Sequence, residues 1–153
     1  MTQENKELLM VDLCGRLPYG VKVEHLLHAP NNPSDLFAID VDKQVLYCDH
    51  KGREEWYKVE FVKPYLRPMT SMTEDERKEW KSLIFDENFA RLFYKNDNSI
   101  ELWVNRHSDY DLEIDFNLVL EAISWLLSHH FDFRGLLDKG LAIEVTKDNN
   151  PYN

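Results

Sequence analysis

The sequence predicts an α+β fold, in which a small antiparallel sheet and a second β-meander pack with two or three helices. Two groups of short stretches alternate apolar and polar residues, which is typical of antiparallel strands. Stretches with apolar residues three or four positions apart, which are typical of helices, come before, between and after these groups. The 153 residues predict a single α+β domain, 1–153, with a division into a β-rich part (1–70) and a helix–meander–helix part (71–153) as the alternative.

The first group of strands follows an expected helix over residues 4–15, which Gly15 and Pro18 end. Strands are expected at residues 21–27, 36–41, 44–48 and 56–61, with a two-residue turn at 42–43. The segment 62–68 is expected to leave the sheet, because its prolines cannot donate ladder hydrogen bonds. The result is a sheet of about four strands, of a size that can roll up into a barrel.

A helix over residues 72–85 is expected to open the second half, since Thr73 and Glu76 have the spacing of a capping box, as do Ser71 and Glu74. Strands are then expected at residues 91–95, 100–104 and 110–116, with a longer helix through residues 87–93 as the alternative to the first of them.

The C-terminal part is expected to begin with a long helix over residues 116–129. Its apolar residues cover most of the circumference, which predicts a helix that is covered on several sides. Asp132 is expected to cap a helical turn over residues 133–138 that Gly140 ends. The last residues, 147–153, are expected to form a frayed tail.

Charge and hydropathy disfavour two classes of partner. The net charge is −10, and a broad nucleic-acid-binding surface gains its affinity by neutralising phosphates with basic side chains. No apolar run approaches the roughly 20 residues that span a bilayer. The N-terminal residues lack the basic-then-apolar order of a signal peptide. We therefore expect a cytoplasmic protein without a membrane partner.

The two cysteines do not form a recognisable site. Cys14 and Cys48 lie outside any C-x-x-C motif, so we expect two buried thiols. Cys48 and His50 share one strand face, but a nucleophile and its base also need a third group that orients the base. The motifs of phosphate-binding loops, dinucleotide-binding folds, zinc proteases and serine hydrolases are missing. We therefore expect no enzymatic activity and no cofactor.

An acidic run holds Asp109, Asp111 and Glu113 at alternating positions. A calcium-binding EF-hand loop that began at Asp109 would need glycine at its sixth position, where Ile114 stands. Alternation with period two instead predicts the solvent-exposed face of a strand. The row of carboxylates is also a candidate partner surface, because it can imitate the spacing of phosphates.

A basic segment with interleaved aromatic residues is the second candidate surface. Its candidate surface residues are Lys51, Arg53, Trp56, Lys58, Lys63 and Arg67, and its other aromatic residues are Tyr57, Phe61 and Tyr65. This composition is typical of grooves for single-stranded nucleic acid, where bases stack on rings and cations follow the backbone. The alternative is that one aromatic face belongs to the core while the basic side chains keep an edge strand in solvent.

Four polar residues near the C-terminus form the third candidate: His129, His130, Asp132 and Arg134. Adjacent helical residues point about 100° apart, so the two histidines cannot both face one metal ion on a regular helix. A cationic histidine is favoured at a helix C-terminus, and Arg134 can reach the helix carbonyls or Asp138. We expect a buried polar cluster without a metal ion, with a ligand site in a cleft at His130 as the alternative.

Three blocks carry a resemblance to a known group of proteins. They are Leu17–Val23, Val62–Glu76 with its PYLRPM and SMTE stretches, and Trp125–Ala142 with HHFDFRGLL and KGLA. These blocks, about a quarter of the chain, resemble those of a family of short proteins without an assigned activity, from gut-bacterial genomes, phages and integrated elements. Residues 86–115 depart most from that pattern. The resemblance implies a phage-linked or mobile-element context, and it implies no catalytic residue.

These observations predict a non-enzymatic accessory protein that binds another protein. The prediction rests on the missing catalytic motifs, the 12% of aromatic residues and the acidity. Two alternatives remain open. One is binding of single-stranded nucleic acid through residues 51–67, and the other is an acidic decoy that occupies a host DNA-binding protein.

Overall fold

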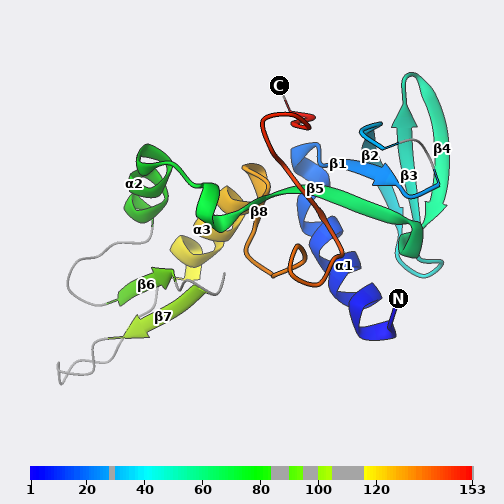
Figure 1. The fold of residues 1–153 in the computed structure, drawn as a ribbon. Helices are drawn as coiled ribbons and strands as arrows, with labels where there is room; N and C mark the ends of the chain where they lie inside the picture. The colour runs from blue at the N-terminus through cyan, green and yellow to red at the C-terminus, as the bar shows by residue number, and fades with distance from the viewer. Residues whose placement is uncertain (28–29, 84–89, 95–99, 105–115, 153) are drawn as a thin grey trace.

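A computed structural model describes residues 1–27, 30–83, 90–94, 100–104 and 116–152, and these residues form an α+β fold (Figure 1). One mostly antiparallel sheet contains seven strands in the order β4-β3-β2-β1-β5-β8, with β9 also paired to β5. Its strands are β1 (Lys22–His25), β2 (Ser34–Asp40), β3 (Val45–His50), β4 (Arg53–Lys58), β5 (Val62–Pro68), β8 (Phe131–Asp132) and β9 (Ile143–Glu144). The helices are α1 (Gln3–Arg16), α2 (Glu74–Ser82) and α3 (Phe116–Ser128). A separate antiparallel hairpin consists of β6 (Ala90–Tyr94) and β7 (Ile100–Val104).

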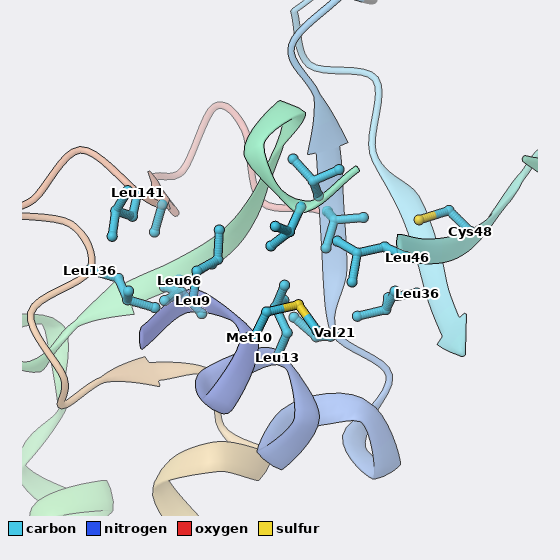
Figure 2. Packing of buried hydrophobic residues seen from close by; sticks show 14 residues of the cluster. Leu9, Met10, Leu13, Val21, Leu36, Leu46, Cys48, Leu66, Leu136 and Leu141 are labelled. Carbon is cyan, nitrogen blue, oxygen red and sulfur yellow. The ribbon is translucent and has the colours of Figure 1, made fainter. Parts of the chain in front are cut away.

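The first helix, α1, confirms the prediction from apolar spacing. It begins after Thr2, whose side chain accepts a hydrogen bond from the backbone N–H of Asn5 at 3.2 Å, as an N-cap does. Leu9 and Leu13 lie one turn apart and are fully buried against the sheet (Figure 2). The core around them joins residues from β1, β2, β3 and β5 to Leu136 and Leu141 near the C-terminus.

The strands β1 to β4 follow the predicted meander with different turns. The predicted two-residue turn at 42–43 is wrong, because β2 ends at Asp40 and β3 begins at Val45. The tight turn lies instead between β3 and β4, at Lys51 and Gly52, whose φ values are 53° and 82°. Two successive residues with positive φ are typical of the turn that best suits the twist of a hairpin.

The strand β5 corrects the prediction that residues 62–68 leave the sheet. Residues Val62–Pro64 pair antiparallel with β1, the next two residues pair parallel with β9, and Arg67 and Pro68 pair parallel with β8. Each proline therefore ends a ladder, where a missing N–H donor costs little. Because β5 changes neighbours at its prolines, it can hold both ends of the chain in one sheet.

The sheet curls, but it does not close into the barrel that the sequence suggested. His25 of β1 stacks on Tyr57 of β4 across the inner face, with ring centroids 3.9 Å apart. After β4, a short 3-10 turn over Val59–Phe61 takes the chain across to β5, which pairs with β1. Within the described strands, β4 is therefore hydrogen-bonded only to β3 and forms one edge of the sheet (Figure 1).

The second helix, α2, begins two residues later than predicted. Thr73 is its N-cap, and Thr73 and Glu76 form the expected capping box. Trp80 is buried and donates a hydrogen bond from its indole N–H to the carbonyl of Ala122 at 3.2 Å. This contact joins α2 to α3 in a second apolar cluster, which is completed by Met69, Met72, Trp125, Leu126 and Phe131.

The third helix, α3, is less covered than predicted, since the side chain of Leu120 is 60% exposed. The strand β6 (Ala90–Tyr94) lies where one was expected at 91–95, and β7 (Ile100–Val104) confirms the predicted strand at 100–104. The strand predicted at 110–116 lies almost wholly outside the described residues. No helix in the described part of the chain combines the length and the apolar character that a bilayer crossing requires.

The C-terminal segment corrects two further predictions. Residues 133–138 do not form a helix, since 133–135 are irregular and turns begin at residue 136. Asp132 does accept hydrogen bonds from the backbone N–H groups of Leu136 and Leu137 at 2.9 and 2.7 Å. The tail is also docked, not frayed. The hydroxyl of Tyr152 accepts a hydrogen bond from the N–H of Lys22 at 3.2 Å and donates one to the carbonyl of Tyr65 at 2.8 Å. It thereby bridges β1 and β5 one residue beyond their last direct pair.

Candidate functional site

Three aromatic side chains lie together on the outer face of the sheet. Tyr47 of β3 lies opposite Trp56 of β4, and Phe37 of β2 lies beside Tyr47 with ring centroids 6.5 Å apart. Trp56 is 65% exposed and Phe37 is 46% exposed. We call Phe37, Tyr47 and Trp56 the aromatic face. It crosses the three strands that lie side by side at the edge of the sheet (Figure 1).

A bulge in β2 explains why Phe37 lies on this face. The pairing of β2 with β3 runs from Leu36 opposite Cys48 to Ala38 opposite Tyr47, so Phe37 is the extra residue. Leu36 and Ile39 both pack in the core, although they are three positions apart in the sequence. The bulge lets both Leu36 and Ile39 face the core, and it leaves Phe37 in solvent next to Tyr47.

The fold divides the basic segment between two places. The turn and β4 carry Lys51, Arg53, Trp56 and Lys58, which are all exposed. Lys63 and Arg67 lie on β5 and are half-buried. The strands β3, β2 and β1 separate the two groups within the sheet.

Arg67 also forms an ion pair with Glu76. Its guanidinium donates two hydrogen bonds to the carboxylate of Glu76, at 2.8 and 2.9 Å. This pairing lowers the pKa of Glu76 to about 2, with further hydrogen bonds from Thr73 in the same direction. The residues Lys51 to Arg67 therefore do not form one continuous basic groove.

Cys48 and His50 do not form an activated pair. Cys48 is fully buried, and burial, together with the charges of Glu55 and Asp35, raises the pKa of its thiol to about 12. His50 has its ring nitrogens near the Ser34 hydroxyl, at 2.9 Å, and the Asn32 amide, at 3.2 Å. A thiolate is the reactive form of cysteine, so this environment opposes nucleophilic chemistry.

Cys14 is exposed on α1, so the prediction of two buried thiols is wrong for this residue.

Two of the four C-terminal polar residues, His129 and His130, line a hollow of about 760 Å³, whereas Asp132 binds the backbone of Leu136 and Leu137 and Arg134 lies beside Asp12. His129, His130 and Ser128 at the end of α3 line the hollow, with Arg67 of β5 and Tyr152 of the tail. His130 is buried, as expected, and it also lines this hollow; that the hollow takes a ligand stays a prediction. Its ring stacks on that of Tyr152, with centroids 3.8 Å apart. His129 stacks on Trp125 at 3.9 Å.

His130 is neutral at neutral pH, which corrects the expectation of a cationic histidine at the helix end. Burial is the largest cause, and the nearby charges of Arg16, His129 and Arg67 add to it; together they lower the pKa of His130 to about 4. His130 also ends α3 with a φ of 59°, and its carbonyl accepts a hydrogen bond from the N–H of Arg67 at 2.8 Å.

A buried ion pair that the sequence analysis missed lies behind this cluster. Asp12 and Arg16 are both fully buried on α1, and their side chains are joined by hydrogen bonds of 2.6 and 3.1 Å. Arg16 also donates to the carbonyl of Phe131 at 2.8 Å, and Nε of Arg134 lies 3.5 Å from Asp12. The i,i+4 spacing of an acid and a base on the apolar side of a predicted helix was the available signal.

The pKa of His130 leads to a prediction about stability. An unfolded histidine has a pKa of about 6.5, so between pH 6.5 and about 4 the unfolded chain binds a proton that the folded chain does not. The contribution of neutral His130 to the free energy of unfolding is therefore fully present above pH 6.5, and it is lost as the pH decreases through that window. We expect His130→Gln to remove about 2 kcal/mol of this loss, since water in the hollow reduces the full effect of the shift. Urea unfolding at a series of pH values measures it, and parallel profiles for the two proteins would contradict the prediction.

The remaining candidate residues Asp109, Asp111 and Glu113 lie outside the described residues, so their role stays a prediction. Within the described ranges, no group of three or more histidine, cysteine, aspartate or glutamate side chains is arranged to hold a metal ion. Comparison of the chain with protein-family models, with curated proteins and with solved structures finds no match.

Proposed function

We propose that this protein is a non-enzymatic accessory protein that binds another protein through its aromatic face. The exposure of Trp56 supports this proposal most strongly, because two-thirds of this large ring is in solvent beside Tyr47 and Phe37. Aromatic residues are enriched in protein interfaces, and tryptophan and tyrosine often contribute most of the binding energy. A contiguous apolar patch of this kind on a folded surface is typical of an interaction site.

The polar residues around the aromatic face suit a protein partner better than a nucleic acid. Asp49 and Glu54 pair across β3 and β4, two residues from the pair of Tyr47 and Trp56 and on the same side of the sheet. Lys58 lies two residues further along β4 in the other direction. Charges of both signs around an apolar centre are the usual rim of a protein interface. Carboxylates next to the exposed ring would repel the phosphates of a single strand.

A photo-cross-linking residue in place of Phe37 identifies the partner in lysates of phage-infected bacteria, which the mobile-element resemblance makes the first source to search. The same residue in place of Val11, which is 56% exposed on α1, is the matched control. The test itself uses the purified partner. We expect Trp56→Ala to raise its Kd at least about tenfold, as for a central interface residue, and Val11→Ala to leave the Kd unchanged.

Two results would contradict the proposal. One is that Trp56→Ala and Val11→Ala have equal Kd values for the partner captured by the cross-linking residue at position 37. The other is salt-sensitive binding of a single-stranded oligonucleotide that Trp56→Ala and Lys58→Ala both weaken, since this is the behaviour of a nucleic-acid-binding surface.

A further inference from the structure

The hydrogen-bonding pattern between β3 and β4 determines which backbone groups point outward from the free edge of β4. In an antiparallel pair, every second residue exchanges its hydrogen bonds with the neighbouring strand. The N–H of Val59 donates to the carbonyl of Gln44 at 3.0 Å, which makes these two residues a hydrogen-bonded pair. Counting from it in steps of two, Arg53, Glu55 and Tyr57 face β3. The tight turn at Lys51 and Gly52 agrees, because His50 and Arg53 then close it.

The N–H and C=O groups of Glu54, Trp56 and Lys58 therefore point away from the sheet. The strand contains no proline, and no other described strand pairs with this edge. The three side chains lie on the outer face, and Trp56 stands in the middle with an acid two residues before it and a base two residues after it. An edge of this kind is a template for pairing with another chain.

We propose that β4 pairs antiparallel with β4 of a second copy of this chain, about a two-fold axis that passes next to Trp56. The main support for this pairing is the order of charges along β4, with an acid before Trp56 and a base after it, because this order is complementary to the same order in an antiparallel second copy. With Trp56 opposite Trp56, each Glu54 lies opposite Lys58 of the other copy, and opposite charges in such positions stabilise a sheet.

The backbone fits the same register. The residues that this symmetry places opposite one another are those whose N–H and C=O groups point outward from each edge, so each pair can exchange two hydrogen bonds. The two sheets become one, and the two copies of Trp56 meet on its outer face. This pairing goes beyond the proposed partner binding, because it depends on the backbone edge of β4. It shares Trp56 with the aromatic face but does not use Phe37 or Tyr47.

Charge exchange tests the register by sedimentation of the full chain over a range of concentrations. The parent protein is expected to dimerise. Glu54→Lys and Lys58→Glu are each expected to raise the dimer dissociation constant at least about tenfold, because the symmetry places each like-charge contact at the interface twice. The double variant Glu54→Lys/Lys58→Glu restores opposite charges and should return to the parent value. Glu121→Lys and Lys139→Glu make the same charge changes at exposed positions elsewhere and should have no effect.

A proline tests the backbone separately. Lys58 has a φ of −70°, which proline adopts without strain, and its N–H points outward, so Lys58→Pro should leave the fold intact. We expect Lys58→Pro to be monomeric at concentrations where Lys58→Ala still dimerises. Both variants should have equal circular dichroism, and equal Tm when it is measured in dilute protein where both are monomeric. A parent protein that stays monomeric, a double charge variant that does not recover, or equal dimerisation of Lys58→Pro and Lys58→Ala would each overturn the proposal. Binding of an extended peptide to a monomeric parent would show a different occupant of the same edge and would also overturn it.

Discussion

Replacement of Asp12 by alanine is expected to lower the free energy of unfolding by about 3–5 kcal/mol, because it leaves the charge of Arg16 buried without its partner. Both side chains are fully buried, and the carboxylate of Asp12 accepts two hydrogen bonds from Arg16. Arg16 would keep its bond to the carbonyl of Phe131, which does not neutralise the charge. Arg134 would also lose the anion that lies 3.5 Å from its Nε.

Urea unfolding monitored by tryptophan fluorescence measures the effect of Asp12→Ala. Asp42→Ala, in an exposed loop, is the control and should change the free energy by no more than about 0.5 kcal/mol. The double variant Asp12→Leu/Arg16→Met removes both charges and keeps apolar volume. It should be more stable than Asp12→Ala, because the cost comes from the unpaired charge more than from the lost pair. A double variant that is less stable than Asp12→Ala would contradict this account of the ion pair.

Replacement of Phe131 by alanine is expected to cost about 3–5 kcal/mol, the usual range for emptying a buried phenylalanine site. Phe131 is fully buried, and its ring packs parallel to that of Trp125 at a centroid distance of 5.8 Å. The guanidinium of Arg67 lies 4.2 Å from the ring centroid, and this cation–π contact would be lost as well. Phe131 therefore packs between Trp125 of α3 and Arg67 of β5.

Phe133→Ala is the matched control for Phe131→Ala. Phe133 is only half-buried, and its cationic neighbours lie 5.1 and 5.9 Å from its ring centroid. We expect it to cost about 1 kcal/mol. Equal losses from the two substitutions, measured by chemical unfolding, would show that Phe131 does not have the structural role described above.

Local patterns in the sequence predicted the helices best. The capping box of Thr73 and Glu76 and the apolar spacing of Leu9 and Leu13 each depend on residues within one or two turns, so they can be read along the chain. The strands were placed less well, because β5 contains two prolines and its pairing depends on three other strands. Whether a proline interrupts a ladder or stands at its end depends on which strands pair with β5. The residues of β5 alone do not show which strands these are.

The candidate site was predicted only in part, for the same reason. Trp56 and Lys58 were identified from composition, but Phe37 and Tyr47 were missed because a bulge in β2 brings them together. His130 was identified, but its contact with Tyr152 joins residues that a turn-rich segment separates. The pKa of His130 depends on burial and on Arg16, which is contributed by the opposite end of the chain.

Amide hydrogen exchange of β4, resolved by residue and measured at low and high protein concentration, tests the central claim most directly. That claim is that β4 and the aromatic face beside it are where this protein contacts other protein chains. The amides of Glu55 and Tyr57 should be protected at both concentrations, because they face β3. The amides of Glu54, Trp56 and Lys58 should exchange rapidly in dilute protein and slowly in concentrated protein. Rapid exchange of these three amides at both concentrations, and in the presence of a purified partner, would contradict the claim.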